Sequence, residues 1–440
     1  MSKLALLGGA KSVEKRNDAM FHWPIVNQEM RDAVLKVLED GSMSGIEITQ
    51  EFERKFAEWS GVKYALACPN GTDALREAMF AVGVGMNSEL ICPSVTYWAS
   101  CMPAIGLGAR VVFADIEPDT LCLDPKSFEA HITPRTKAVV VVHYLAHPAD
   151  MDPIMEIAHR HGIKVIEDVS HAHGALYKGR KVGTFGDVAA CSMMSGKSFA
   201  VGEAGMLYTN DRNVYEKAIT FGHYERIHTV ENHLPLPEGV GYLPWGGCKH
   251  RTNQMCSALG LCQLKKYDAE TAEIHAAMSY FTDQLARIPG LYRHYPSKWE
   301  NSTKGGWYCP HMFYDTSKFG GLSLQRFCEA LRAEGVDDTW AGCNTPLHRS
   351  TLFSKVDIFG GLGRPTANLF DDSDAREQSG PLPISDRVNN VLFALPSFKH
   401  DWREEIDQYI AAYVKVAENY QELLPGDSHH DEVQGLFFAF

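Results

Sequence analysis

Short apolar runs alternate with amphipathic stretches between residues 62 and 209. Seven of the runs have the length and β-branched content of buried strands: VKYALAC, ELIC, ARVVFAD, KAVVVVH, IKVIEDV, VAACSM and GMLYT. Between them, TDALREAMFAVG and DPIMEIAHRHG have helical spacing, and each ends at a glycine that can cap a helix. This alternation predicts an α/β fold with a mostly parallel sheet and helices on both faces. In such sheets ligands bind beyond the carboxyl ends of the strands.

The remainder of the chain predicts a second, smaller unit. A long helical stretch over residues 252–287 links the two, and beyond residue 290 strand-like runs mix with the helical stretches SLQRFCEALRAEG and WREEIDQYIAAYVKVAENYQELL. We expect an amino-terminal segment (1–45) packing near the active site, a large domain (46–265) and a small α+β carboxyl-terminal domain (266–440). Two loop-like insertions, 227–247 and 354–380, are either lids, interface elements or surface loops.

Composition restricts the partners. The chain has 440 residues, of which 45% are apolar and 22% charged, and its net charge of −13 argues against nucleic acid or an anionic membrane as the main partner. The first apolar run is too short for a secretory signal, and the run from residue 138 is too short to span a bilayer. Eleven cysteines without a C-x-x-C pair fit reduced thiols. We therefore expect a cytoplasmic protein.

Lys197 lies in the stretch CSMMSGKSFAVGEAGMLYTND, residues 191–211. Its neighbours resemble the end of a phosphate loop, but the first glycine of G-x-x-x-x-G-K-[ST] is replaced by Cys191. A lysine that bonds covalently to an aldehyde needs burial or a nearby cation, because its amine must be unprotonated part of the time. Lys197 sits between an apolar strand and a turn of small residues, which predicts a cleft. A solvated surface lysine is the alternative for this residue taken alone.

An acidic residue ends the strand IKVIEDV. Asp168 would point into the ligand crevice, because it lies at the carboxyl end of a buried strand. An electron-sink cofactor such as pyridoxal phosphate needs an acidic partner on its ring nitrogen, and Asp168 fits that role. Taken alone, Asp168 could equally be a metal ligand or a helix N-cap.

The stretch CPNGTDALREA places Gly71 and Thr72 between a strand and a helix. Gly71 allows close approach of the backbone, and Thr72 offers a hydroxyl beside the free N–H groups of a helix start. This arrangement suits the phosphate of a cofactor. The alternative is an ordinary turn with a helix cap.

Two aromatic residues follow the next strand in CPSVTYWAS. Either Tyr97 or Trp98 could stack on a planar ring. Packing in the core is the alternative for both.

In this order the motifs resemble the DegT/DnrJ/EryC1/StrS family of sugar aminotransferases. The resemblance covers nearly the whole chain; it is most specific over residues 165–211 and looser at NTPLHR and LPISDRV. It implies the aspartate-aminotransferase-like fold, that is, fold type I of the pyridoxal 5'-phosphate (PLP)-dependent transferases. The implied reaction moves an amino group from glutamate or glutamine to a nucleotide-linked keto-sugar or a keto-cyclitol, with ping-pong kinetics. The stretch LALLGGAKSV is similar to that of cyclitol aminotransferases, whereas nucleotide-sugar members are more numerous.

The resemblance also implies residue roles. Lys197 matches the Schiff-base lysine, which carries the proton between substrate and cofactor carbons, and Asp168 matches the partner of the pyridine nitrogen. His171 matches the residue beside the phenolic oxygen or ring, and Tyr97 the aromatic that stacks on the ring. The family's phosphate ligands correspond to Gly71, Thr72 and Ser192.

The family's active sites lie at a homodimer interface. The partner subunit supplies an asparagine from an N-[YFH]-R stretch, and the matching stretch here is CKHRTNQ. Lys249 thus replaces the asparagine, and Arg251 keeps the arginine. We expect Lys249 to reach the phosphate of the partner's cofactor as a point charge, or else an acidic substrate, and Arg251 to contact substrate.

Other activities were weighed against this one. The family's dehydratase branch has a histidine at the position of Lys197, so the lysine in this chain argues against a dehydratase. A branch that makes an aminated aromatic acid keeps the lysine, and this alternative stays open. A metallohydrolase could use a set of histidines, but no H-E-x-x-H motif is present and we expect no metal. That set is His143, His147, His159, His161, His171 and His173. Intact Lys197 and Asp168 disfavour a non-catalytic regulatory homologue.

Overall fold

Seven strands form the central sheet of the protein, in the order β1-β9-β8-β5-β4-β2-β3. The computed structural model of the chain describes residues 3–230, 243–361, 380–429 and 432–435. The strands are β1 (Tyr64–Cys68), β2 (Glu89–Pro93), β3 (Arg110–Ala114), β4 (Thr136–Val142), β5 (Lys164–Asp168), β8 (Val188–Ser192) and β9 (Gly205–Thr209). Each of the seven apolar runs in the sequence corresponds to one of them.

The centre of this sheet is parallel. Parallel pairs join β3 to β2, β2 to β4, β4 to β5 and β5 to β8, while β9 pairs antiparallel with β8 and with β1. Strands β2 and β3 are buried along their whole length, which their unbroken apolar sequence requires. The predicted α/β fold with a mostly parallel sheet is therefore confirmed.

Helices surround the sheet, and their ends follow local sequence signals. Helix α3 starts where the Asn70 side chain accepts the N–H of Asp73 at 2.9 Å, and α6 ends at Gly162, whose φ is +67°. The helices of this part are α1 (Gln28–Glu39), α2 (Glu47–Ser60), α3 (Gly71–Ala81), α4 (Met102–Gly106), α5 (Pro125–Ala130), α6 (Met151–His161) and α7 (Arg212–Gly222). A small hairpin, β6 (Leu176–Tyr177) and β7 (Arg180–Lys181), follows β5.

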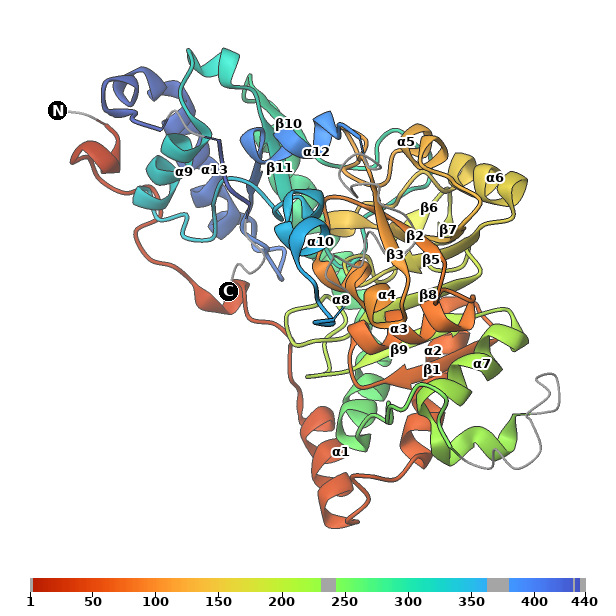
Figure 1. The fold of residues 1–440 in the computed structure, drawn as a ribbon. Helices are drawn as coiled ribbons and strands as arrows, with labels where there is room; N and C mark the ends of the chain where they lie inside the picture. Colours follow the sequence, from red (N-terminus) through yellow and green to blue (C-terminus); the bar gives the residue numbers. More distant parts are fainter. Residues whose placement is uncertain (1–2, 231–242, 362–379, 430–431, 436–440) are drawn as a thin grey trace.

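A second hydrophobic core lies beside a three-stranded antiparallel sheet, ordered β10-β11-β12. Figure 1 shows this sheet with α9 and α13 on one side of the molecule and the seven-stranded sheet on the other. The elements of this part are β10 (Leu291–Arg293), β11 (His311–Tyr314), α9 (Leu324–Ala333), β12 (Leu392–Ala394) and α13 (Arg403–Glu418). Helices α10 (Thr351–Lys355) and α12 (Pro383–Arg387) pack instead against the core of the large sheet.

Helix α8 (Gln254–Leu285) belongs to both cores. Tyr267 packs in the core of the large sheet, whereas Ile274 and Phe281 pack in the second core. The change of packing thus falls inside this one helix. The domain limits expected after residues 45 and 265 stay predictions.

The amino-terminal segment connects the two cores. Leu4, Val13 and Met20 are buried in the second core, and the chain then runs down to α1, which packs on α8 (Figure 1). On the way, the indole N–H of Trp23 donates to the carbonyl oxygen of Lys197 at 2.9 Å.

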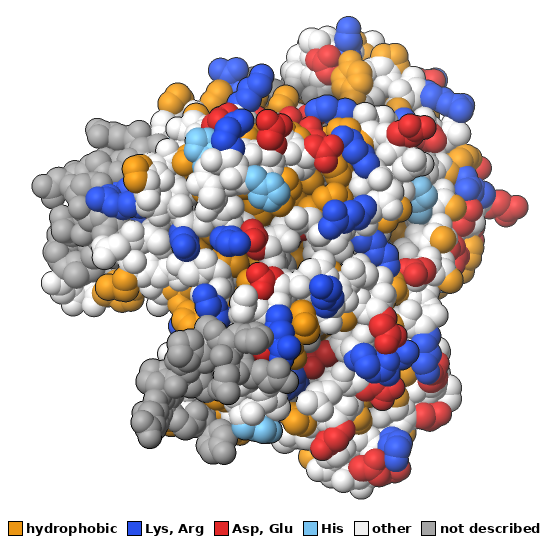
Figure 2. All heavy atoms as spheres, turned by 90° about the vertical axis from the view of Figure 1, so that its right-hand side faces the viewer, with side chains coloured by type: hydrophobic (Ala, Val, Ile, Leu, Met, Phe, Trp, Pro, Cys, Tyr) orange, Lys and Arg blue, Asp and Glu red, His pale blue; other side chains and the backbone are white. Residues whose placement is uncertain are grey.

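The described surface is mixed in charge. Figure 2 shows acidic and basic side chains interspersed over one face, so on this face the net charge of −13 is not gathered into one patch. Among the described helices, none combines the length and the hydropathy needed to cross a bilayer.

Candidate active site

A cavity of about 350 Å³ opens where the parallel strands end. One wall carries residues that end or follow β2, β4, β5 and β8, including Val142 and Asp168. The opposite wall comes from residues 308–311 and 340–344 beside the second core. The volume is that of a site for a small ligand or cofactor.

Lys197 lies in this cavity, in the turn between β8 and β9. It is 8% exposed, and its amine lies 4.0 Å from the centre of the Tyr308 ring. Burial lowers the pKa of Lys197 from 10.5 to about 8, against the opposing effect of the negative charge on Asp168. About one amine in ten is therefore unprotonated at pH 7, far more than for an ordinary lysine, and a nucleophile requires this form.

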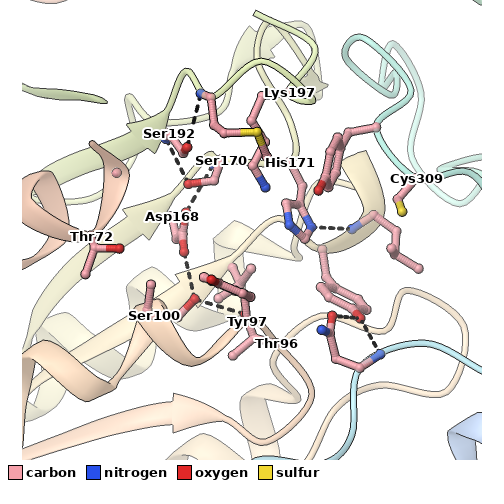
Figure 3. Close-up of a pocket in the computed structure, with 18 of the residues that line it drawn as sticks. Thr72, Thr96, Tyr97, Ser100, Asp168, Ser170, His171, Ser192, Lys197 and Cys309 are labelled. Carbon is pink, nitrogen blue, oxygen red and sulfur yellow. Dashed lines mark hydrogen bonds between the residues drawn. The ribbon is translucent and has the colours of Figure 1, made fainter. Parts of the chain in front are cut away.

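Asp168 is the last residue of β5 and is 4% exposed. Its Oδ2 accepts the hydroxyl of Ser100 at 2.7 Å, and its Oδ1 accepts the N–H of Ser170 at 3.1 Å (Figure 3). These two donors orient the carboxylate inside the cavity wall. A carboxylate held in this way can accept a further N–H from a bound ring.

The start of α3 and the end of β8 form the third part of the site. The Asn70 side chain accepts the N–H of Asp73. The N–H groups of Gly71 and Thr72, in the first turn of the helix, have no intrahelical partners. A Cβ on Gly71 would lie 2.6 Å from the Cβ of Ser192, so only glycine allows this approach. Thr72 and Ser192 add hydroxyls to the same cavity. Free N–H groups at a helix start, beside two hydroxyls, bind anions such as phosphate.

Replacing Gly71 by alanine should separate these two elements. We expect a loss of about 1–3 kcal/mol of folding free energy from the overlap, together with weaker binding of a phosphate-bearing cofactor. Thermal unfolding and cofactor titration measure the two effects. Gly106→Ala is the matched control, because a Cβ there meets nothing within 4 Å. Wild-type cofactor affinity in Gly71→Ala would contradict the role of this contact.

His171 and Tyr97 supply rings to the cavity. The N–H of Leu145 donates to Nδ1 of His171 at 3.4 Å. Burial, followed by the charge of Lys197, holds the pKa of His171 well below its usual value, so the ring is neutral. Tyr97, whose ring centre lies 5.0 Å from that of Trp98, is the member of the aromatic pair that lines the cavity.

Lys249 and Arg251 are outside the cavity of their own chain. Lys249 is exposed, while His250 between them is buried and contacts Glu77 at 2.8 Å. Burial raises the pKa of Glu77, but the charges and hydrogen bonds of His223 and His250 outweigh it and lower the pKa to about 2. The stretch that carries Lys249 is therefore anchored to α3 through this buried group.

Several lining residues were missed from the sequence. Those from the wall beside the second core are Tyr308, Cys309, His311, Trp340 and Asn344. Those from the loops that follow the strands of the large sheet are Ser100, Ser170 and Glu203. The sequence signal that could have pointed to this wall was the Gly305–Gly306 pair, because paired glycines mark a close approach of the backbone. A Cβ on Gly305 would lie 2.2 Å from the carbonyl oxygen of His173, and a Cβ on Gly306 would lie 2.2 Å from the Cβ of Ser198.

The histidines of the metallohydrolase hypothesis do not form a metal-like cluster in the described residues. The group with suitable spacing there consists of Cys68, Glu77 and His223, all buried and all outside that set. Residues 231–242 and 362–379, which make up most of the two insertions, lie outside the described residues.

Comparison with known proteins gives consistent matches. The profile of the DegT/DnrJ/EryC1/StrS aminotransferase family matches residues 24–360. The GDP-perosamine synthase of Caulobacter vibrioides is 38% identical over 266 residues, 60% of this chain and 69% of that protein. The L-glutamine:2-deoxy-scyllo-inosose aminotransferase of Streptoalloteichus tenebrarius is 33% identical over 420 residues, 91% of this chain and 96% of that protein. The X-ray structure of an aminotransferase from Psychrobacter cryohalolentis superimposes with a TM-score of 0.77 at 28% identity, covering 91% of this chain and 99% of that one.

Proposed function

The chain belongs to the DegT/DnrJ/EryC1/StrS aminotransferase family, and from this premise we propose that it transfers an amino group from glutamine or glutamate to the keto group of a cyclitol or a nucleotide-linked sugar, with PLP as its cofactor. The donor's α-amino group and α-hydrogen exchange with the keto oxygen of the acceptor, so no oxidant is consumed. The observation that carries this proposal is the convergence of Lys197, Asp168 and the Gly71–Ser192 contact on one cavity.

The chemistry of the cavity fits PLP at three points. Gly71, Thr72 and Ser192 would hold the phosphate, Asp168 would hold the ring nitrogen, and Lys197 would hold the aldehyde carbon. The Gly71–Ser192 contact is a cradle that a Cβ would fill, as expected where a backbone must approach a phosphate. When bound, PLP supplies an electron sink for the electron pair released at the substrate carbon.

The residues of the chain would do the proton chemistry. Nζ of Lys197, with its pKa near 8, can take a proton from one carbon and return it to another at neutral pH. Asp168 keeps a proton on the ring nitrogen, because a buried carboxylate stabilises the adjacent cationic N–H. Tyr308 covers Lys197 from the opposite wall and limits the access of water to its amine.

The lowered pKa of Lys197 predicts how the rate of PLP capture by the apoprotein depends on pH. Below pH 8 the unprotonated fraction of the amine falls about tenfold per pH unit, so the capture rate should rise with pH and level off above about pH 8. Stopped-flow absorbance after mixing measures it. A lysine peptide is the control, because its rate should keep rising to about pH 10. An apoprotein rate that tracks the peptide would contradict the lowered pKa.

Near full-length similarity to the inosose aminotransferase favours a cyclitol acceptor and a glutamine donor. Mass spectrometry of the products from keto-cyclitols and nucleotide-linked keto-sugars, each incubated with glutamine or glutamate, tests this choice. We expect an aminated cyclitol with glutamine. Amination of the nucleotide-sugars alone would reverse the choice of acceptor, and no amination of any acceptor by the PLP-loaded protein would overturn the proposed reaction.

The same acceptor test addresses the aromatising synthase that the sequence left open. A dehydrated aromatic product that carries the amino group, in place of an aminated sugar or cyclitol, would favour the synthase. All eleven cysteines lie in the described ranges and none forms a disulfide, which supports our placing the enzyme in the reducing cytoplasm.

We also propose a homodimer with shared active sites, to which Lys249 contributes across the interface. Lys249→Ala should weaken PLP binding about tenfold, through the loss of one charge-assisted contact. At a PLP concentration that loads wild-type sites but leaves most Lys249→Ala sites empty, mixing Lys197→Ala chains with Lys249→Ala chains should restore activity. Half of the random dimers are then mixed, and one site in each of these has both lysines. Activity should reach about a quarter of the wild-type value per site, by the same shared-site logic. If both lysines act within one chain, the mixture should show only the residual activity of the Lys249→Ala chains.

A further inference from the structure

A second buried lysine lies directly behind the active site. Lys304 is 3% exposed, and its Nζ donates to the carbonyl oxygen of Leu145 at 2.8 Å and contacts Nδ1 of His294 at 3.1 Å. Neither contact is a carboxylate, although a buried ammonium group is usually paired with one. The cavity lining does not include Lys304. Its contacts therefore call for an explanation other than an ion pair or direct contact with a ligand.

His294 is set to receive this lysine. Its Nε2 faces the carbonyl oxygen of Thr120 at 2.9 Å and must donate there, which leaves Nδ1 as an acceptor for Lys304. The His147 ring stacks on the His294 ring, with 4.9 Å between the ring centres. Burial, followed by the charge of Lys304, holds the pKa of His294 well below its usual value, so the ring stays neutral in this role.

Leu145 connects Lys304 to the cavity. Leu145 and Ala146 both have left-handed backbone angles, with φ of 50° and 66°, a conformation that non-glycine residues adopt only under constraint. Lys304 binds the carbonyl of Leu145, and the N–H of the same residue points at Nδ1 of His171. Leu145 is thus bound at its carbonyl by Lys304, while its N–H faces His171.

The chain that follows Lys304 supports the same arrangement. Gly305 and Gly306 pack tightly on the backbone of His173 and on Ser198. Tyr308 then reaches both His171, at a ring distance of 4.5 Å, and the amine of Lys197. A shift of Lys304 would therefore reach His173 through the two glycines and His171 through Tyr308.

We propose that Lys304 is a positioning residue of the active site: by binding the carbonyl of Leu145 it directs the Leu145 N–H at Nδ1 of His171 and so keeps the imidazole proton on Nε2. The role of His171 beside PLP rests on the proposed function. The proton position itself does not, because it is a property of the apoprotein. Neutral His171 held in this form can donate one hydrogen bond from Nε2.

The first test is made on the wild-type apoprotein. Nitrogen chemical shifts of ¹⁵N-labelled histidine report the tautomer, and the His171 signal is assigned by its loss in His171→Gln. We expect a protonated Nε2 and an unprotonated Nδ1. A proton on Nδ1 would overturn the proposal, whatever the variants below do and whether or not the enzyme transfers amino groups.

The second test removes the donor. Lys304→Met should retain the fold and give His171 a mixture of tautomers, and kcat should fall about tenfold, as for the loss of one orienting hydrogen bond, with KM for the donor little changed. Lys181→Met is the matched control, because Lys181 also donates to a carbonyl, that of Trp59, outside the cavity. An unchanged tautomer in folded Lys304→Met would sink the proposal. If this variant does not fold, His294→Leu removes the second contact that holds Lys304 against the Leu145 carbonyl. It should give a smaller shift toward the other tautomer, and no shift would count against the proposal.

Discussion

Replacing Lys197 by alanine should abolish amino transfer, with kcat falling about ten-thousand-fold or more, because the proton carrier and the covalent anchor are lost together. Of the buried lysines with a lowered pKa in the described residues, Lys197 is the one that lines the cavity. The fold should persist, since the main partner of its side chain is the Tyr308 ring. Steady-state kinetics measure turnover, circular dichroism measures the fold, and the visible absorption of bound PLP reports the loss of the covalent anchor.

Lys181→Ala is the control for general damage. Lys181 is half-buried and lies over the Trp59 ring at 3.9 Å, away from the cavity. The Lys181→Ala variant should keep the wild-type kcat and the bound PLP. Residual turnover of Lys197→Ala within about tenfold of the control would show that another group carries the proton, because general acid–base transfer is worth more than that.

Replacing Asp168 by asparagine should lower kcat about 100- to 1,000-fold, the range seen when one preorganised electrostatic partner is removed. Asparagine keeps the shape of the side chain and an acceptor for Ser100, but it lacks the charge that holds a proton on the ring nitrogen. PLP should still bind, because the proposed phosphate ligands lie at the start of α3 and the end of β8, not at Asp168. Kinetics and PLP titration separate the two properties.

Ser100→Ala provides the comparison for this variant. It removes the hydrogen bond of 2.7 Å to Asp168 and leaves the charge, so kcat should fall by about tenfold at most. If Asp168→Asn behaves like Ser100→Ala, the carboxylate acts only as a hydrogen-bond acceptor. Equal and large losses in both variants would instead point to a collapse of the wall at the end of β5.

The large sheet could be predicted from the sequence because its strands are buried on both faces. Burial of this kind requires unbroken apolar runs, and the run KAVVVVH became β4 with only its first two residues partly or fully exposed. The end of each parallel strand then placed Asp168, Ser192 and Tyr97 at one edge of the sheet. These positions follow from topology alone, without any knowledge of side-chain packing.

The opposite wall could not be predicted in the same way. Tyr308, His311 and Trp340 reach the cavity only because the second core packs beside the first, and that packing depends on contacts far apart in the sequence. The positive φ angles of Trp307 and Cys309, which aim this wall, leave no mark in the residue types. For the same reason the link from Lys304 to His171 was invisible before the turn at Leu145 was seen.

Lys249 shows a different limit. The resemblance of CKHRTNQ to the family's N-[YFH]-R stretch predicted a contact of Lys249 with a second chain, and within its own chain Lys249 is exposed beside the buried His250. One chain alone contains no information on what faces that exposed amine. The mixing experiment supplies it.

The covalent role of Lys197 has a direct test. Reduction of the PLP-loaded protein with sodium borohydride fixes any bond between a lysine and the cofactor aldehyde, and peptide mass spectrometry then locates the added mass. The account predicts the cofactor on the peptide that contains Lys197. A stable adduct on Lys304 or on the half-buried Lys399, whose pKa values burial also lowers, would contradict it, and so would the absence of any adduct in a protein that transfers amino groups.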